Sequence, residues 1–359
     1  MSSEYHRPPI KIALLGLGRA VFFEHYPVFR QHPALFNIVA ACDLEKDRRD
    51  KVLADYPNCK MFRQVPDMLA ETDIDLVLVA TPSKDHAAHA MACLEKGFWT
   101  LVESPLALTM EVAQFLRGAA FKAKNRLLVL QRGLLAPDFL LTKQVVSDLR
   151  LGELYDIKIR REDYIRRDDW QTVKRLGGGA VYYEMTDLIM QAIQLLPAPP
   201  IQMWSDLKRI VSLGDAEDCV RVQLKTRTLA TADIEYNGGV FAENRTYSFV
   251  LRGARGNFYV KPGESKGELV VIDPKFNFPR RRSSVRTPEI EDMHEQFPVV
   301  RIPVELDKGT EYGVSAFWKY IYATVRTASP FPITLEDAIE AVKFAQLMKK
   351  NTAFAANAN

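Results

Sequence analysis

The sequence predicts an α/β protein. An N-terminal doubly wound parallel sheet of the Rossmann type is expected to precede a C-terminal α/β domain with a large open, mostly antiparallel sheet. Between residues 10 and 150, apolar runs alternate with amphipathic stretches of helical period, which is typical of parallel βαβ units. Beyond residue 153, strand-like runs follow one another with few helices between them. We expect domains at residues 1–132 and 133–359, with the C-terminal helices able to pack back on the first domain.

The N-terminal elements follow from short apolar runs and the helical patterns between them. Strands are expected at residues 10–15, 36–42, 76–80, 99–102 and 127–131. Helices are expected at residues 86–96 and 109–124. Because βαβ crossovers are right-handed, these elements predict a doubly wound sheet.

The C-terminal half begins with a strand and a helix and then becomes rich in strands. Strands are expected at 155–162, 201–210, 219–225, 228–236, 247–252, 256–260 and 268–272. Helices are expected at 180–196, 313–329 and 335–355, the first of them ended by a proline cluster at 197–200. An open sheet with an uncovered face predicts self-association, as a homodimer or homotetramer through this sheet.

Composition excludes several classes of protein. The 48 Lys and Arg against 45 Asp and Glu leave a net charge of +3, too small to indicate nucleic-acid binding. The four cysteines lack CxxC spacing, which predicts neither a metal site nor a disulfide framework and suits the cytoplasm. Residues 1–9 lack the apolar core of a signal peptide, and no apolar run approaches a membrane span of roughly 18 residues.

A glycine-rich turn directly follows the first expected strand and opens a helix. Gly16 permits the tight turn, and Gly18 lets the backbone approach a pyrophosphate at the helix N-terminus. The third glycine of the usual fingerprint is replaced by Val21. The pattern predicts a dinucleotide site, with a βα turn that binds nothing as the alternative.

An acidic residue, Asp43, follows the second expected strand. At that place a carboxylate hydrogen-bonds the adenosine ribose and repels a 2′-phosphate, so the sequence favours NAD. Arg48 and Arg49 lie close enough in sequence to leave NADP open.

Several further motifs occur in a specific order. They include Val79-Ala80-Thr81-Pro82 with His86, Glu103-Ser104-Pro105, the glycine run 177–179 preceded by Asp169-Trp170, His25 after the first turn, and residues 333–338 near the end. In order and spacing, over nearly the whole chain, this resembles the glucose–fructose oxidoreductase and inositol dehydrogenase family. That family joins a Rossmann domain to an α/β domain built on a large open sheet.

The resemblance implies a cofactor cleft and its residues. Gly16, Gly18, Arg19 and Ala20 would hold the pyrophosphate, and Asp43 the ribose. Thr81, Pro82 and His86 would line the nicotinamide side, with Glu103 and Pro105 beneath it, where family members often have a cis peptide bond. Gln131 and Arg132 lie at the end of the last Rossmann strand, where the loops of a parallel sheet point toward the ligand. They could contact the cofactor or the substrate, and the alternative is that they contact neither.

The sequence departs from the family at the two motifs that handle protons. Ser104 replaces the lysine of the usual Glu-Lys-Pro motif, and Tyr183 and Asp187 occupy the positions of the usual aspartate and histidine. Tyr183 could serve as an acid with Asp187 as its partner, because residues four apart share a helix face. Lys174 and Arg175 are candidate cations to lower the tyrosine pKa. The alternative is that these side chains only fill the vacated site.

Three functions remain open. The first is an NAD(P)-dependent oxidoreductase of a sugar, cyclitol or related polyol, with Ser104, Tyr183 and Asp187 as a non-standard acid/base set. The second is a non-catalytic dinucleotide-binding sensor or regulator, which loss of the lysine and histidine would leave behind. The third is a lyase or glycosidase-like activity, in which bound NAD is reduced and reoxidised within one turnover. For the chain as a whole we expect a small-molecule, carbohydrate-like substrate and neither a nucleic-acid nor a membrane partner.

Overall fold

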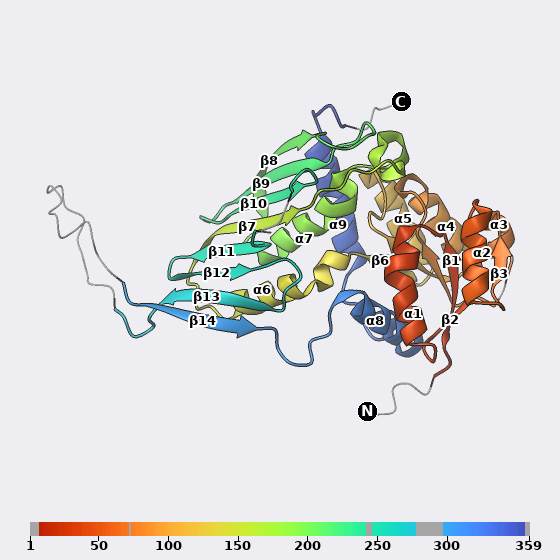
Figure 1. The fold of residues 1–359 in the computed structure, drawn as a ribbon, viewed down its shortest axis with the longest axis horizontal. Coiled ribbons are helices and arrows are strands. Elements are labelled where there is room, and N and C mark those ends of the chain that lie inside the picture. The colour runs from red at the N-terminus through yellow and green to blue at the C-terminus, as the bar shows by residue number, and fades with distance from the viewer. Residues whose placement is uncertain (1–6, 72, 242–245, 278–296, 356–359) are drawn as a thin grey trace.

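A computed structural model describes residues 7–71, 73–241, 246–277 and 297–355. Two sheets lie side by side, each with helices packed against it (Figure 1). The predicted fold class is confirmed: a parallel Rossmann sheet is joined to a second, mostly antiparallel sheet. Among the described residues, no helix is long and apolar enough to cross a membrane. Nor do the described His, Cys, Asp and Glu side chains form a cluster that could hold a metal ion.

The N-terminal sheet has the strand order β3-β2-β1-β4-β5-β6, and every pairing in it is parallel. Its strands are β1 (Ile10–Leu15), β2 (Phe36–Cys42), β3 (Lys60–Phe62), β4 (Leu76–Val79), β5 (Trp99–Glu103) and β6 (Leu127–Leu130). The order reverses between β1 and β4, and ligands of such sheets bind beyond the carboxyl ends of the strands at that reversal.

Helices cover both faces of this sheet. They are α1 (Tyr26–Gln31), α2 (Lys46–Asp55), α3 (Val65–Leu69), α4 (His86–Glu95) and α5 (Met110–Lys122). A π-helical turn, Val21–His25, precedes α1. Near the end of the chain, α8 (Gly313–Thr327) returns to this domain, where the Trp318 ring lies 4.6 Å from that of Phe29 and 5.3 Å from that of Phe36.

The second sheet has the order β14-β13-β12-β11-β7-β10-β9-β8, with β7 and β10 as its one parallel pair. Its strands are β7 (Leu154–Glu162), β8 (Pro200–Lys208), β9 (Cys219–Thr226), β10 (Thr231–Asn237), β11 (Phe249–Gly253), β12 (Gly256–Val260), β13 (Lys266–Ile272) and β14 (Val299–Glu305). Helices α6 (Pro137–Ser147), α7 (Thr186–Leu195) and α9 (Leu335–Lys349) pack on one face. Alternation along β9 shows this: Val220, Val222 and Leu224 are buried, whereas the residues between them are exposed.

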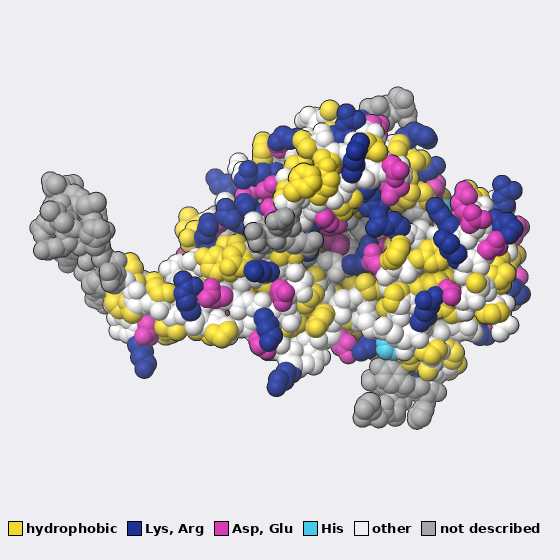
Figure 2. All heavy atoms as spheres, in the orientation of Figure 1, with side chains coloured by type: hydrophobic (Ala, Val, Ile, Leu, Met, Phe, Trp, Pro, Cys, Tyr) yellow, Lys and Arg dark blue, Asp and Glu magenta, His cyan; other side chains and the backbone are white. Residues whose placement is uncertain are grey.

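The other face of this sheet is covered by cross-strand ion pairs. Arg252 faces Asp156 on the neighbouring strand at 2.8 Å, and Arg221 lies 2.9 Å from Asp233. Basic and acidic side chains are interspersed over the face of the molecule in Figure 2, without a continuous patch of one sign. The open face therefore combines charged pairs with partly exposed apolar side chains.

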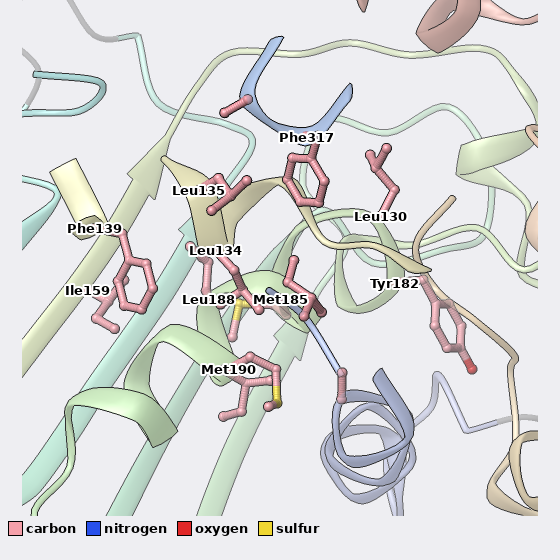
Figure 3. Packing of buried hydrophobic residues seen from close by; sticks show 14 of the residues in the cluster. Leu130, Leu134, Leu135, Phe139, Ile159, Tyr182, Met185, Leu188, Met190 and Phe317 are labelled. Atoms are coloured by element: carbon pink, nitrogen blue, oxygen red, sulfur yellow. The ribbon is translucent and has the colours of Figure 1, made fainter. Parts of the chain in front are cut away.

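A single core crosses from one domain to the other. Leu134 and Leu135, just after β6, pack with Met185 and Leu188 from the start of α7 and with Phe317 of α8 (Figure 3). This packing holds the residues that follow β6 against α7, and so brings polar side chains of the two domains together.

The strands β3 and β14, the helix α6 and the short helices α1, α2 and α3 were absent from the sequence prediction, and α9 is clearly shorter than expected. β3 is only three residues long, too short for a periodic pattern. β14 contains Pro303 and is an edge strand, the place in a sheet that tolerates proline. α6 begins with Pro137, which suits a first helical turn. α9 ends at Lys349 rather than at residue 355.

Candidate functional site

The glycine-rich turn after β1 is packed tightly against the ends of the neighbouring strands. Gly16 has φ +89°, and a Cβ there would lie 2.7 Å from the carbonyl oxygen of Ala80. Only glycine fits both constraints. The turn leads into a helix whose first N–H groups lack intrahelical partners, the arrangement that binds phosphate. Arg19 is exposed at this turn, and Gly18 and Ala20 are half-buried.

Asp43 is tied to this turn. Its Oδ2 accepts a hydrogen bond from the Leu17 amide at 2.7 Å, and its Oδ1 accepts one from the Glu45 amide at 2.9 Å. Each carboxylate oxygen keeps a second lone pair, so Asp43 can still accept from ribose hydroxyls. The Arg48 guanidinium lies 3.6 Å from Oδ2, whereas Arg49 bonds backbone carbonyls.

On the expected nicotinamide side, His86 holds two backbone segments together. Its Nδ1 lies 2.8 Å from the carbonyl oxygen of Pro105, and its Nε2 lies 2.8 Å from that of Thr81. The ring is buried, and burial lowers its pKa. A neutral imidazole donates only one hydrogen bond, so one carbonyl receives it at a time. His86 thus positions Thr81 and the cis Ser104–Pro105 peptide, while Pro82 is half-buried beside them.

Glu103, at the end of β5, takes part in a buried relay. The Trp318 indole donates to Nδ1 of His25 at 3.0 Å, and Nε2 of His25 lies 2.9 Å from Oε1 of Glu103. Because an indole can only donate, Nδ1 must accept, and the imidazole proton on Nε2 is donated to Glu103. Helix α8 therefore fixes the orientation of a carboxylate at the carboxyl end of the parallel sheet.

Arg132 lies between carboxylates from both halves of the protein. Its guanidinium contacts Glu24 in the first π-helical turn, and its NH2 group lies 3.8 Å from Oε2 of Glu103. Burial lowers the Arg132 pKa, whereas the charges of Asp187 and Glu184 oppose that shift. A guanidinium remains charged in such surroundings, so Arg132 is the cation of the site.

Asp187 approaches this cation from α7. Its Oδ2 accepts a hydrogen bond from the Gly133 amide at 2.8 Å, and its buried Oδ1 has no hydrogen-bond partner among the residues that the structure describes. Gly133 permits the approach, because a Cβ there would lie 2.7 Å from that of Asp187. Burial raises the Asp187 pKa to about 6, against the opposing effects of the Gly133 hydrogen bond and of Arg132.

Glu184 is a second carboxyl of the same helix. It belongs to a π-helical turn, Val181–Met185, that leads directly into α7. Burial, opposed by the Arg161 charge and aided by the Asp187 charge, raises its pKa to about 7. Two carboxyls with raised pKa values beside a guanidinium form a group that can take up and release a proton near neutrality.

Ser104 and Tyr183 have different surroundings from this group. Ser104 Oγ lies 3.1 Å from Thr186 Oγ1, which donates to the carbonyl of Tyr182. Tyr183 packs edge-to-face on Tyr236 of β10, and burial raises its pKa above the ordinary value. The cation over its ring is Arg167, at 5.8 Å.

The two cations that the sequence suggested for Tyr183 are not the ones beside it. Lys174 Nζ lies 5.9 Å from the Phe354 ring and bonds the Ala353 carbonyl, and Arg175 is exposed. The structure thus brings Asp187, Glu103 and Arg132 together, while Tyr183 and Asp187 contact different elements.

Sequence reasoning missed Glu184 and Glu24. Both are fourth residues of π-helical turns, in Val181–Met185 and Val21–His25. Such turns have no recognisable sequence pattern, although they are frequent at functional sites. The His25–Trp318 contact spans most of the chain, so no local pattern could have revealed it.

Comparison with known proteins agrees with this geometry. Residues 10–131 match the model of an oxidoreductase family with an NAD-binding Rossmann fold, and residues 139–259 match the GFO/IDH/MocA C-terminal domain. An uncharacterized oxidoreductase of Schizosaccharomyces pombe is 30% identical over 269 residues, which are 72% of this chain and 73% of the relative. The scyllo-inositol 2-dehydrogenase (NADP(+)) of Bacillus subtilis is 27% identical over 198 residues, 53% of this chain and 52% of the relative.

Among solved structures, the WlbA dehydrogenase of Chromobacterium violaceum in complex with NADH and UDP-GlcNAcA superposes with a TM-score of 0.76. Its sequence is 18% identical, and the match covers 96% of this chain and 93% of that one. At this identity the likeness concerns the fold.

Proposed function

Because this chain belongs to the Gfo/Idh/MocA oxidoreductase family and has its NAD-binding Rossmann domain, we propose that it oxidises a secondary alcohol of a sugar, cyclitol or related polyol, or runs the reverse reaction. The single observation that carries the proposal is the Asp187 carboxyl. It has an unpartnered buried oxygen and a raised pKa, and it belongs to a group with Arg132 and Glu103 at the carboxyl ends of β5 and β6.

The chemistry needs both a hydride acceptor and a proton acceptor. NAD, when bound by the proposed cofactor residues such as Gly16, Gly18 and Asp43, would supply the hydride-accepting chemistry. The hydroxyl proton must go to a protein group within hydrogen-bond reach. The unpartnered Oδ1 of Asp187 is suited to accept it, which leaves a ketone, the reduced cofactor and a protonated carboxyl.

Carboxyls replace the usual lysine and histidine in this account. A general base works best when its pKa lies near the working pH, and about 6 for Asp187 and about 7 for Glu184 meet that condition. Arg132 offsets the charge that Asp187 carries before it takes the proton. Tyr183 fits the role of acid less well, because burial raises its pKa. Ser104 can orient a substrate hydroxyl as donor or acceptor but does not titrate in the useful range.

The substrate class rests on the relatives. One is named for scyllo-inositol and the other was solved with a nucleotide sugar, and both molecules are polyhydroxylated rings. The cofactor-binding residues that we propose are Gly16, Gly18, Arg19, Ala20, Asp43, Thr81, Pro82, His86, Glu103 and Pro105. Asp43 favours NAD over NADP, because a carboxylate repels a 2′-phosphate.

Two measurements test this function. A thermal-shift titration with NAD, NADH, NADP and NADPH ranks the cofactors, since binding to the native state raises apparent stability. Absorbance at about 340 nm, where reduced nicotinamide absorbs, then follows turnover on a panel of inositols, glycosides and nucleotide sugars. We expect NAD-dependent turnover that Asp187→Asn strongly lowers and that the exposed control Asp168→Asn retains. Cofactor binding without turnover on any polyol would instead support the sensor hypothesis.

We also propose that copies of the chain associate through the open face of the second sheet. Partly exposed apolar side chains, Val250, Tyr259 and Val270, lie between the charged pairs of that face. Light scattering of wild type against Val250→Glu tests this, with a dimer or tetramer that the variant dissociates as the expected result. A monomer at all concentrations contradicts it.

A further inference from the structure

A buried ion pair joins the last helix to the loop that precedes β9. Lys349 Nζ lies 2.9 Å from Oε1 and 3.0 Å from Oε2 of Glu217, and the two residues are 5% and 1% exposed. Their desolvation is costly, and apolar side chains of similar volume stabilise such a place as well or better. A contribution to stability therefore does not explain why a charged pair is buried at this place.

Glu217 fixes the point where the site helix begins. Its Oε1 accepts a hydrogen bond from the Val181 amide at 3.2 Å, and its backbone carbonyl accepts one from Ala180 at 2.8 Å. Gly179 has φ +115°, and a Cβ there would lie 2.2 Å from Oε1. The glycine run therefore leaves room for this carboxylate at the helix N-terminus, where the helix dipole favours a negative charge.

Lys349 lies at the C-terminal end of α9 and contacts the start of the same site helix. It is the last residue of α9, where the dipole favours a positive charge, and its ammonium lies 4.5 Å from the centre of the Tyr182 ring. The Tyr182 carbonyl accepts from Thr186, which in turn contacts Ser104. A continuous series of contacts thus links Lys349 of α9 to Ser104, the residue that follows Glu103.

These contacts determine where the two site carboxyls lie. Glu184 and Asp187 follow Val181 by three and six residues, within one continuous π- and α-helical segment. A shift or rotation of the helix start would move both carboxyls relative to Arg132 and Gly133. Misplacement of a catalytic group by about 1 Å can lower a rate by about a hundredfold.

We propose that Glu217 and Lys349 are positioning residues, which hold the start of the site helix so that Asp187 and Glu184 face Arg132. The inference rests on the proposed function for its catalytic consequence, but the positioning itself does not depend on turnover.

The test compares Lys349→Met with Lys343→Met, a matched control. Lys343 is exposed on the same helix, and its nearest carboxylate, Glu340, is 3.9 Å away. We expect Lys349→Met to lower kcat by about tenfold to a hundredfold and to shift the pH profile of kcat. Its Kd for NADH should stay within about threefold of wild type, because the cofactor residues lie on the other domain. Lys343→Met should resemble wild type in all three measurements.

A second readout needs no substrate. NMR of ¹³C-labelled side-chain carboxyls, assigned with Glu184→Gln and Asp187→Asn, gives the titration midpoints of the two carboxyls. Lys349→Met should move both midpoints, and Lys343→Met neither. If Lys349→Met does not fold, Glu217→Gln replaces it, because its amide oxygen can still accept from Val181 while the ion pair is lost.

The possible results distinguish the positioning role of Glu217 and Lys349 from the proposed function. Unmoved midpoints in a folded Lys349→Met or Glu217→Gln variant overturn the positioning role, whatever the turnover shows. Moved midpoints in a protein that turns over no polyol support the positioning role and count against the proposed function.

Discussion

Glu184→Gln should change how stability depends on pH. Burial raises the pKa of Glu184 from 4.5 to about 7, so between these values the folded state binds more protons than the unfolded state. Wild-type stability therefore falls as the pH rises through this interval, and it is greatest below it. Asp187, raised from 3.8 to about 6, contributes with the same sign. Glutamine does not titrate, so the variant lacks the part of this loss of stability that comes from Glu184.

The size of the effect follows from the shift. A pKa change from 4.5 to about 7 corresponds to an upper limit of roughly 3–4 kcal/mol. Partial solvent access to Glu184 and its coupling to Asp187 reduce this to about 1–3 kcal/mol. We expect Glu184→Gln to match wild type near about pH 4.5 and to be more stable above about pH 8. The gain in Tm should be roughly 1–2 °C for each kcal/mol, because a chain of this length unfolds with a large entropy change.

The assay is thermal unfolding, followed by tryptophan fluorescence at both pH values. Glu95→Gln, an exposed carboxyl of α4, is the control and should follow wild type at each pH. If Glu184→Gln and wild type lose stability equally as the pH rises, then Glu184 does not titrate in the folded protein as argued. The assignment of the site carboxyls would then be wrong.

Three further substitutions test other parts of the account. Gly16→Ala should abolish NAD binding in calorimetry, because its Cβ would lie 2.7 Å from the Ala80 carbonyl oxygen at φ +89°; unchanged affinity would contradict this. Tyr183→Phe should keep most of the turnover, because burial raises the tyrosine pKa. A loss of turnover as large as that expected on removing a general acid would show that Tyr183 takes part in the reaction. Trp318→Phe leaves Nδ1 of buried His25 without its donor and should cost about 1–3 kcal/mol in denaturant unfolding; a cost near zero would show that the relay is not formed.

The Rossmann half could be predicted from sequence because its signals are local. Gly16 and Asp43 are recognised by their places at the ends of two strands, and in the structure the Asp43 carboxylate bonds the turn that contains Gly16. Short strand-like runs predicted the bounds of β1, β2 and β12 to the residue. Short or proline-containing edge strands, β3 and β14, have no such pattern.

The proposed acid/base group could be predicted only in part. Asp187 was identified by its place after the glycine run, but its contact with Gly133 joins segments 54 residues apart. Glu184 went unrecognised because the helix begins with a π-helical turn, in which side chains do not follow the α-helical period. The relay from Trp318 to His25 depends on α8 returning to the first domain, a tertiary contact that helical periodicity does not reveal.

The most direct test of the account is the pH dependence of kcat/KM for polyol oxidation, in wild type and in Asp187→Asn. With Asp187 as proton acceptor, wild-type kcat/KM should rise as the pH passes through about 6, and the variant should be slow, with that rise gone. An Asp187→Asn enzyme that keeps both the rate and the rise would contradict the account, because the proton would then leave by another group.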